Sequence, residues 1–294
     1  MNEKPSGSLI GTGAERVKDA VRYHLIRRAH HIGYWAGKVN KANAISWWRD
    51  AYNRLMRPGY GLPGSYQRVF FYHIRKAAGT TVTYSFLSLG GQSNLVYQRM
   101  SRDPEHRVVA RGRVFAGWDA RQVENGNYFY AWSHAPAHRL SIPEHTFTLT
   151  SLRDPAARIV SHYAMLRRHM RERPQHPCLL EEQQYMGGGF CEFLERLPRH
   201  KLLAQLHHFS PHYDVESAYE SIMACNHVIF VEDFNDGLQK LAEKTGLPLR
   251  STHVGQSSRN DKPHLTADMR DQLRTQLQPE YVLYERVRAA LTSS

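Results

Sequence analysis

The stretch FFYHIRKAAGTTVTYSF, residues 70–86, decides the fold because three local patterns follow one another in it. An apolar and aromatic run typical of a buried strand comes first, the small residues 77–79 then form a tight turn, and a helix opened by Thr80 and Thr81 follows. A strand, a small-residue turn and a helix N-terminus form a common phosphate cradle, because free N–H groups and the helix dipole favour an anion. Lys76, however, precedes the glycine of the turn, and no Gly-Lys-Ser/Thr run follows.

The residue types in this turn fit the binding of a phosphate group. Small side chains let backbone N–H groups approach closely, the two threonines add hydroxyl groups, and a lysine and an arginine add charge. The alternative is a plain strand-turn-helix with a threonine N-cap, which is a common arrangement. The clustering of all these residue types favours phosphate binding, through Arg75, Lys76, Ala77, Ala78, Gly79, Thr80 and Thr81.

Composition limits the classes of function. The chain has 294 residues, 41% of them hydrophobic, which suffices for one large α/β domain or two small ones. A formal net charge of +12, beside 18 histidines, indicates anionic partners: nucleotides, nucleic acid, acidic glycans or an anionic membrane. The three cysteines are scattered, which disfavours a disulfide framework or a zinc site and favours a reducing compartment. No apolar run reaches the roughly 18 residues that a membrane span needs.

Residues 1–64 are predicted to form a basic helical extension and a linker. Apolar residues recur near helical spacing over residues 13–57 with basic residues between them, and prolines and glycines follow at 58–64. A basic amphipathic helix can lie on an anionic membrane. A helical extension packed on the main domain is the favoured interpretation, because charge runs usually mark a solvated face. The start of the sequence lacks the apolar core of a secretory signal, so we expect a cytoplasmic bacterial protein, with peripheral contact to the inner face of the membrane as a further expectation.

Residues 65–294 are predicted to form one α/β domain. Strands are expected at 68–74, 128–133, 146–152 and 227–231, and helices at 79–89, 155–171, 213–223, 235–245, 266–277 and 279–290. Strands separated by helices indicate a central parallel sheet covered on both faces. In such sheets ligands bind at the carboxyl ends of the strands, which is where residues 75–81 are expected.

A second motif, TLTSLRDPAARIVSHYAMLRR, covers residues 148–168. Its strand ends at Arg153, and Pro155 suits the first turn of a helix that Asp154 caps. Arg153 at the strand end is expected to reach the ligand crevice, and Ser161, two turns into the helix, is expected to face the same place. Asp154 and Arg158 are interpreted as a local cap and a salt bridge.

Together the two motifs resemble a known family. HIRKAAGTT is similar to the His-Ile-Pro-Lys-x-x-Gly-Thr-Thr loop of carbohydrate sulfotransferases, the heparan 2-O- and chondroitin-like enzymes of sulfotransferase family 2. SLRDPAARIVSHY resembles their Arg-Asp-Pro-x-x-Arg-x-x-Ser-x-Tyr segment. The resemblance covers roughly residues 67–290 and implies a three-layer α/β/α, P-loop NTPase-like fold. It also implies transfer of a sulfuryl group from 3′-phosphoadenosine-5′-phosphosulfate (PAPS), without a metal, to a hydroxyl of a glycan or glycolipid.

The resemblance assigns roles to the two motifs. Lys76 and the residues that follow it would hold the 5′-phosphosulfate, with Lys76 also stabilising the leaving phosphate, and Arg153 and Ser161 would hold the 3′-phosphate. Arg75 departs from the family pattern, which has proline at this position. The sequence offers no role for Arg75 other than added charge or a looser strand end.

A third motif, YFYAWSHAPAHRL at residues 128–140, supplies the candidate base. Its apolar strand ends in Ser133 and His134, and a histidine after this strand is the general base in the enzymes that it resembles. Imidazole suits this role because its pKa lies near neutral pH. His138 is the second candidate, His73 is expected to pack or to orient Lys76, and His162 is expected on a helix face near the nucleotide.

Two further segments are open. In STHVGQSSRNDKPHL, residues 251–265, a loop over the nucleotide would place Ser257, Arg259 and Lys262 near the 3′-phosphate or adenine, and an ordinary surface loop is equally compatible. In YMGGGF, residues 185–190, the glycines indicate either the border of an acceptor pocket or a turn between helices.

Two other functional classes are kept as alternatives. VIFVED, residues 228–233, resembles the Walker B strand of a P-loop kinase or ATPase, although Glu232 and Asp233 at the start of a helix are the simpler interpretation. The missing Gly-Lys-Ser/Thr disfavours magnesium-dependent phosphoryl transfer. A non-catalytic protein that binds nucleic acid or a membrane is the other class. No nucleic-acid-binding motif is present, so we expect no nucleic-acid partner.

Overall fold

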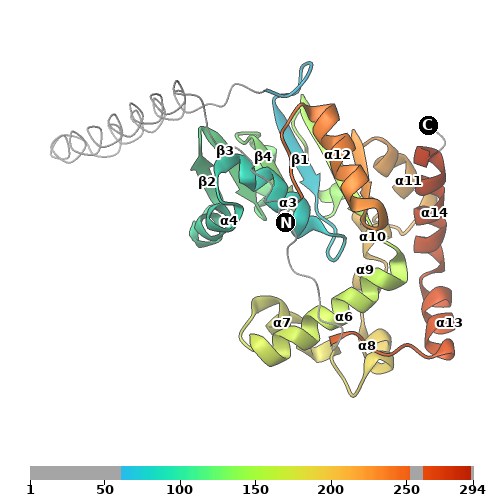
Figure 1. The fold of residues 1–294 in the computed structure, drawn as a ribbon. Coiled ribbons are helices and arrows are strands. Elements are labelled where there is room, and N and C mark those ends of the chain that lie inside the picture. The colour runs from blue at the N-terminus through green and yellow to red at the C-terminus, as the bar shows by residue number, and fades with distance from the viewer. Residues whose placement is uncertain (1–60, 252–260, 293–294) are drawn as a thin grey trace, which may run out of the picture. The chain divides into compact units, whose positions relative to one another are not determined.

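Within the described residues, six strands form one sheet in the order β2-β3-β4-β1-β5-β6, and Figure 1 labels β1, β2, β3 and β4. The computed structural model describes residues 61–251 and 261–292, so the expected helices at 13–57 and the candidates Ser257 and Arg259 lie outside the described residues. The strands are β1 (Arg68–Tyr72), β2 (Arg107–Ala110), β3 (Arg113–Gly117), β4 (Tyr130–Ser133), β5 (Thr146–Leu152) and β6 (His227–Phe230).

The central strand β1 is covered on both faces. Its residues alternate: Val69 and Phe71 pack into the core beneath α3 and α12, whereas Phe70 packs with the opposite face. Helices α6, α10, α11 and α14 contribute to another core, which includes Leu152 at the end of β5. The three-layer α/β arrangement predicted from the sequence is therefore confirmed.

The edge formed by β2 and β3 was not predicted. These strands pair antiparallel, whereas β3, β4, β1, β5 and β6 run parallel, so the sheet is mixed. Arg111 and Gly112 join β2 to β3, and both have positive φ, 46° and 70°. Two such residues form the tight turn that matches strand twist. Arginine is not among the residues that are typical of this turn, which is why the hairpin was not predicted.

The helices bring both predicted motifs to the same edge of the sheet. All six helices predicted in residues 79–290 are present, with ends shifted by a few residues. Helices α4, α5 and α7–α10 were not predicted. The bounds are α3 (Gly79–Leu87), α4 (Ser93–Arg102), α5 (Ala120–Glu124), α6 (Pro155–Glu172), α7 (Pro177–Glu182), α8 (Phe190–Arg196), α9 (Arg199–Leu202), α10 (Ala204–Phe209), α11 (Val215–Met223), α12 (Phe234–Thr245), α13 (Ala267–Gln276) and α14 (Gln278–Thr292). Within the part of the chain that the structure describes, no helix is long and apolar enough to cross a bilayer.

Candidate active site

The β1–α3 loop, residues 73–78, has an unusual backbone. Lys76 and Ala78 have φ angles of 70° and 56°, a region that residues with a side chain seldom adopt. Helix α3 begins at Gly79, the start predicted from the sequence, and Ala78 is its N-cap without a side-chain hydrogen bond. The alternative of a threonine N-cap is therefore wrong, and Thr80 and Thr81 lie in the first turn of the helix.

The cap leaves backbone donors free. Thr81 N–H donates to the carbonyl of Ala78 at 2.9 Å, but the N–H groups of Ala78, Gly79 and Thr80 have no hydrogen-bond acceptor among residues 61–251 and 261–292. Free N–H groups at a helix N-terminus are a ready anion site. The residues present therefore fit a phosphate group at the position that the sequence predicts.

Neighbouring elements hold the carbonyl groups of this loop. The Ser151 hydroxyl donates to the Ala77 carbonyl at 2.5 Å, and Arg153 Nη1 donates to the Lys76 carbonyl at 3.2 Å. Arg153 itself is fixed by Gln205, whose carboxamide bonds both the N–H and the carbonyl of Arg153 at 2.8 and 2.9 Å. The structure thus brings Arg153 and Lys76 together, as predicted, and adds Gln205, which no sequence signal indicated.

Lys76 lies among like charges. Burial is the main cause that lowers its pKa to about 8, and further lowering comes from Arg168, Arg153 and Arg75. Arg168 makes the largest contribution of these charges and was missed in the sequence. Since it lies two helical turns after Ser161 on α6, helical periodicity was the signal that could have found it. Ser161 is buried on α6, and no described contact links it to Lys76.

His134 follows β4 at the same edge of the sheet. Its Nδ1 lies 2.8 Å from the carbonyl oxygen of His73, which follows β1. A carbonyl only accepts, so Nδ1 carries the proton and Nε2 of the neutral ring keeps its lone pair. Loss of solvation by the surrounding protein lowers the pKa of His134 below its ordinary value, and the charge of Arg75 lowers it further. The hydrogen bond to His73 acts in the opposite direction. The residue is nevertheless exposed at the surface. With Nδ1 occupied by this hydrogen bond, Nε2 of the neutral ring is the atom that can accept a proton.

His73 packs as predicted and separates His134 from the helix start. Its ring stacks on Phe71 and lies 4.2 Å, centroid to centroid, from the His134 ring. A Cβ at Gly79 would lie 1.9 Å from atoms of the His73 ring. The glycine in the motif is thus required by a close approach of a side chain.

A cavity of about 450 Å³ opens beside His134. No carboxylate lines it, whereas its walls contain histidines and cationic side chains: His73, His134, His162, His200, His207, His208, Arg75, Arg139, Arg158 and Lys201. His138, the second candidate base, is exposed outside this lining, with its ring 5.5 Å from that of His207. The geometry therefore favours His134 as the base facing the cavity.

The side chain of Arg75 forms an ion pair with the buried carboxylate of Glu182. Glu182 ends α7 and is 0% exposed; Arg75 Nη1 and Lys201 Nζ both contact its Oε1, and His162 Nε2 lies 2.5 Å from its Oε2. Burial acts to raise the pKa of Glu182, but the His162 hydrogen bond and the two cations outweigh it and hold that pKa well below its usual range. The predicted contact of Arg75 with the cofactor stays a prediction.

The remaining residues of the motifs make contacts that stabilise the fold. Asp154 caps α6 by accepting from Ala157 N–H at 2.7 Å, as predicted. The salt bridge of Arg158 is not local as predicted. Its Nη2 lies 3.5 Å from the Oε2 of Glu280 on α14, and both side chains are buried. Glu232 of the Walker-like strand accepts from Asp154 N–H at 2.9 Å and from the Tyr284 hydroxyl at 2.8 Å. These contacts give Glu232 a structural role.

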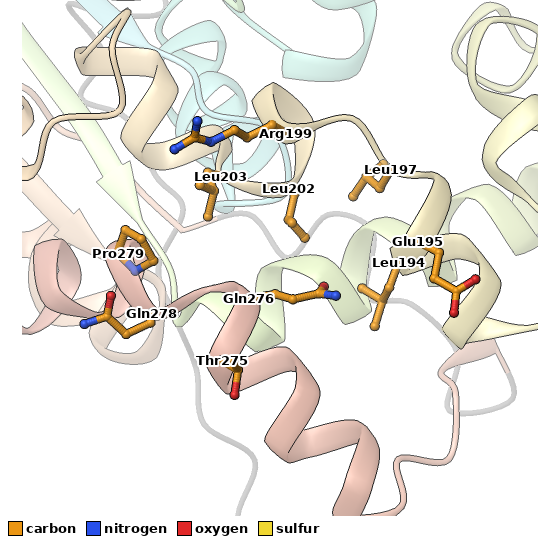
Figure 2. A pocket seen from close by; sticks show the side chains of 10 residues that line it. All are labelled: Leu194, Glu195, Leu197, Arg199, Leu202, Leu203, Thr275, Gln276, Gln278 and Pro279. Carbon is orange, nitrogen blue, oxygen red and sulfur yellow. The ribbon is translucent and has the colours of Figure 1, made fainter.

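A second hollow, of about 530 Å³, lies elsewhere (Figure 2). Leu194 of α8 and Leu202 of α9 line it together with Thr275 and Gln276 of α13. None of the residues predicted to bind or react lines this hollow. The cavity beside His134 is therefore the candidate acceptor site. Across residues 61–251 and 261–292, no group of three or more histidine, cysteine or acidic side chains is arranged to hold a metal ion.

Comparison with known proteins identifies the family of the chain. The family described as "Sulfotransferase family" matches residues 65–286. No curated protein matches the chain.

Proposed function

This chain belongs to the sulfotransferase family, and from that membership we propose that it transfers a sulfuryl group from PAPS to a hydroxyl of a carbohydrate or glycolipid acceptor. The observation that carries the proposal is the hydrogen bond between His134 Nδ1 and the His73 carbonyl. It fixes a neutral base with a free Nε2 beside the loop that carries Lys76. A proton acceptor and an anion cradle are the two groups that transfer to a hydroxyl needs.

The β1–α3 loop fits the 5′ end of PAPS. Free N–H groups at residues 78–80 and the Lys76 ammonium group offer donors to one anionic group, and Arg153 lies against the same loop. Like charges gathered around Lys76 are costly unless an anion binds among them. Ser161 is assigned to the 3′-phosphate with Arg153. When bound, PAPS supplies the activated sulfuryl group and a phosphate leaving group.

The residues of the chain then divide the work. His134 Nε2 accepts the proton of the acceptor hydroxyl as the oxygen becomes nucleophilic. Lys76 and the N–H groups at the start of α3 stabilise the negative charge that grows on the leaving phosphate, where preorganised donors act most strongly. Much of the acceleration comes from holding the two sides in line.

The lining of the cavity supports a polar, acidic acceptor. Arg139 lines the wall without an acidic partner among the described residues, and no carboxylate side chain faces the cavity. Four nitrogen atoms of its lining residues are buried without a hydrogen-bond partner in the described chain: His73 Nδ1, Arg75 Nη2, Arg158 Nε and His208 Nε2. An acidic glycan would bring negative charge to Arg139 and hydroxyl groups to the histidines of the lining.

Two measurements test the proposal. Titration calorimetry with adenosine 3′,5′-bisphosphate should show binding to the full chain, with a rise in melting temperature. Transfer from PAPS labelled with ³⁵S should then be measured on neutral glycans, acidic glycans and glycolipids. Absence of both bisphosphate binding and a shift in melting temperature would refute the proposal.

A further inference from the structure

Arg75 occupies a position whose purpose the sequence leaves open, and the structure gives it a buried partner. Its guanidinium Nη1 contacts Glu182, which is 0% exposed, while the Arg75 side chain is 26% exposed. Glu182 belongs to α7, which is 107 positions further along the chain. A fully buried carboxylate is tolerated only when its charge and hydrogen-bonding capacity are satisfied.

The contact between Arg75 and Glu182 is one of three that hold consecutive residues of the β1–α3 loop. Three consecutive residues are each held by a different partner: the Arg75 side chain by Glu182, the Lys76 carbonyl by Arg153, and the Ala77 carbonyl by Ser151. The middle residue, Lys76, has the left-handed φ of 70°. Residues in sparsely populated conformations persist only where their surroundings over-determine them.

The same carboxylate also organises the wall of the cavity. Its other partners, His162 on α6 and Lys201 on α9, line the cavity with Arg75 and His134. Glu182 is thus joined to the loop beside the donor and to the wall beside the acceptor. None of its contacts reaches a reacting atom, so its role is one of positioning.

We infer that Glu182 is a positioning residue, which acts through Arg75 to hold Lys76 and the free N–H groups in the geometry that binds the donor. The inference rests on the proposed function, because the anion whose binding it controls is the phosphate of PAPS. In this chain, the arginine that replaces the proline of similar loops ties the loop to α7 by an ion pair.

The direction in which Glu182→Gln changes the affinity for the bisphosphate distinguishes a positioning role from a purely electrostatic one. Glu182→Gln removes a negative charge near the donor site, so a purely electrostatic role predicts tighter binding of adenosine 3′,5′-bisphosphate. Positioning predicts about tenfold weaker binding, because a neutral amide no longer anchors Arg75. Glu182→Asp retains the charge and shortens the reach, and it is the second variant in case Glu182→Gln fails to fold. Positioning again predicts weaker binding for Glu182→Asp, whereas electrostatics predicts no change.

The neighbouring carboxylate and Arg75 provide the controls. Glu181 also contacts Lys201, at 3.0 Å, but its side chain is 66% exposed, so Glu181→Gln should leave bisphosphate affinity within twofold. Arg75→Met leaves Glu182 its contacts with His162 and Lys201 and should weaken binding about tenfold. The double variant Arg75→Met/Glu182→Gln should bind no more weakly than the weaker single variant, because both remove one link.

Calorimetry with the bisphosphate, and steady-state kinetics with PAPS, decide the outcome on variants shown to be folded by circular dichroism. A positioning role raises the KM for PAPS, whereas a loss of folded molecules lowers kcat and leaves KM unchanged. Unchanged or tighter bisphosphate binding by folded Glu182→Asp or Glu182→Gln, or losses that add in the double variant, would overturn the inference. Failure of the wild-type chain to bind the bisphosphate would instead remove the proposed function.

Discussion

The carboxyl ends of β1 and β4 lie side by side, yet the two segments that follow them differ in charge and in backbone. After β1, the loop has left-handed φ angles at Lys76 and Ala78 and gathers positive charge. After β4, the Nδ1 atom of His134 is bonded to the carbonyl of His73, and the surrounding protein lowers the pKa of this ring. Under the proposed function, the end of β1 binds an anion and the end of β4 accepts a proton.

On the proposed function, this difference lets one edge of the sheet serve both the donor and the acceptor of the reaction. Cations beside the β1 end favour a bound phosphate, and the same charges disfavour protonation of a nearby imidazole, as the effect of Arg75 on His134 shows. On the proposed function, these cations would help to keep the base unprotonated. If this division holds, substitutions at the two strand ends should impair different steps.

The largest expected effect comes from the β4 end. His134→Ala should lower kcat by about 10²- to 10⁴-fold, because it removes the proton acceptor, and should leave the affinity for adenosine 3′,5′-bisphosphate within threefold. Turnover of labelled PAPS and calorimetry measure the two quantities. His138→Ala is the matched control, since His138 lies outside the cavity lining, and it should retain near-normal turnover. Normal turnover of His134→Ala would move the base to another residue.

The second largest effect is expected from a substitution in the loop after β1. Lys76→Met should weaken bisphosphate binding by about 10- to 100-fold, the range expected for one charge-assisted hydrogen bond of about 1.5–3 kcal/mol. The exposed Lys240 on α12 is paired with Asp236, and Lys240→Met should change the affinity by less than twofold. Equal affinities of Lys76→Met and wild type would show that the N–H groups alone hold the anion.

A third, smaller effect follows from the pKa of Lys76, which burial and neighbouring cations lower to about 8. The ammonium form binds the anion, so affinity should be full below pH 8 and fall by up to tenfold per pH unit above it. Calorimetry with the bisphosphate between pH 7 and pH 9.5 measures this. Lys76→Arg should remove the dependence, because a guanidinium keeps its charge over this range. A flat wild-type profile would contradict the assigned role.

Local patterns were sufficient to predict four of the five parallel strands of the described sheet. The β1, β4, β5 and β6 strands are apolar runs bounded by turns, and the helices between them have clear periodicity. The β2–β3 hairpin was missed because Arg111-Gly112 is not a usual signal for a tight turn. Short helices such as α7 and α9 are fixed by tertiary contacts, for example by Arg158 Nη2 bonding the Lys201 carbonyl at 3.2 Å.

The candidate site shows the same division between local and distant information. His134 and Arg153 directly follow strands, and Lys76 lies in the loop after β1, so topology places the three at one edge of the sheet. Glu182 and Gln205 lie on short helices far along the chain, and no local pattern distinguishes them from surface residues. Their roles depend on packing between helices, which one sequence does not reveal.

The smallest expected effect lies outside both strand ends, at the cap of α6. Asp154 accepts from Ala157 N–H at 2.7 Å, so Asp154→Ala should lower the free energy of unfolding by about 1 kcal/mol. For a domain of this size, that corresponds to a fall of about 2–4 °C in melting temperature. Asp154→Asn should restore most of this loss, because asparagine caps about as well. Bisphosphate affinity should stay within twofold in both variants. Asp154 adjoins Arg153, so a tenfold loss of affinity in Asp154→Ala with normal stability would mean that the carboxylate orients Arg153 in the donor site.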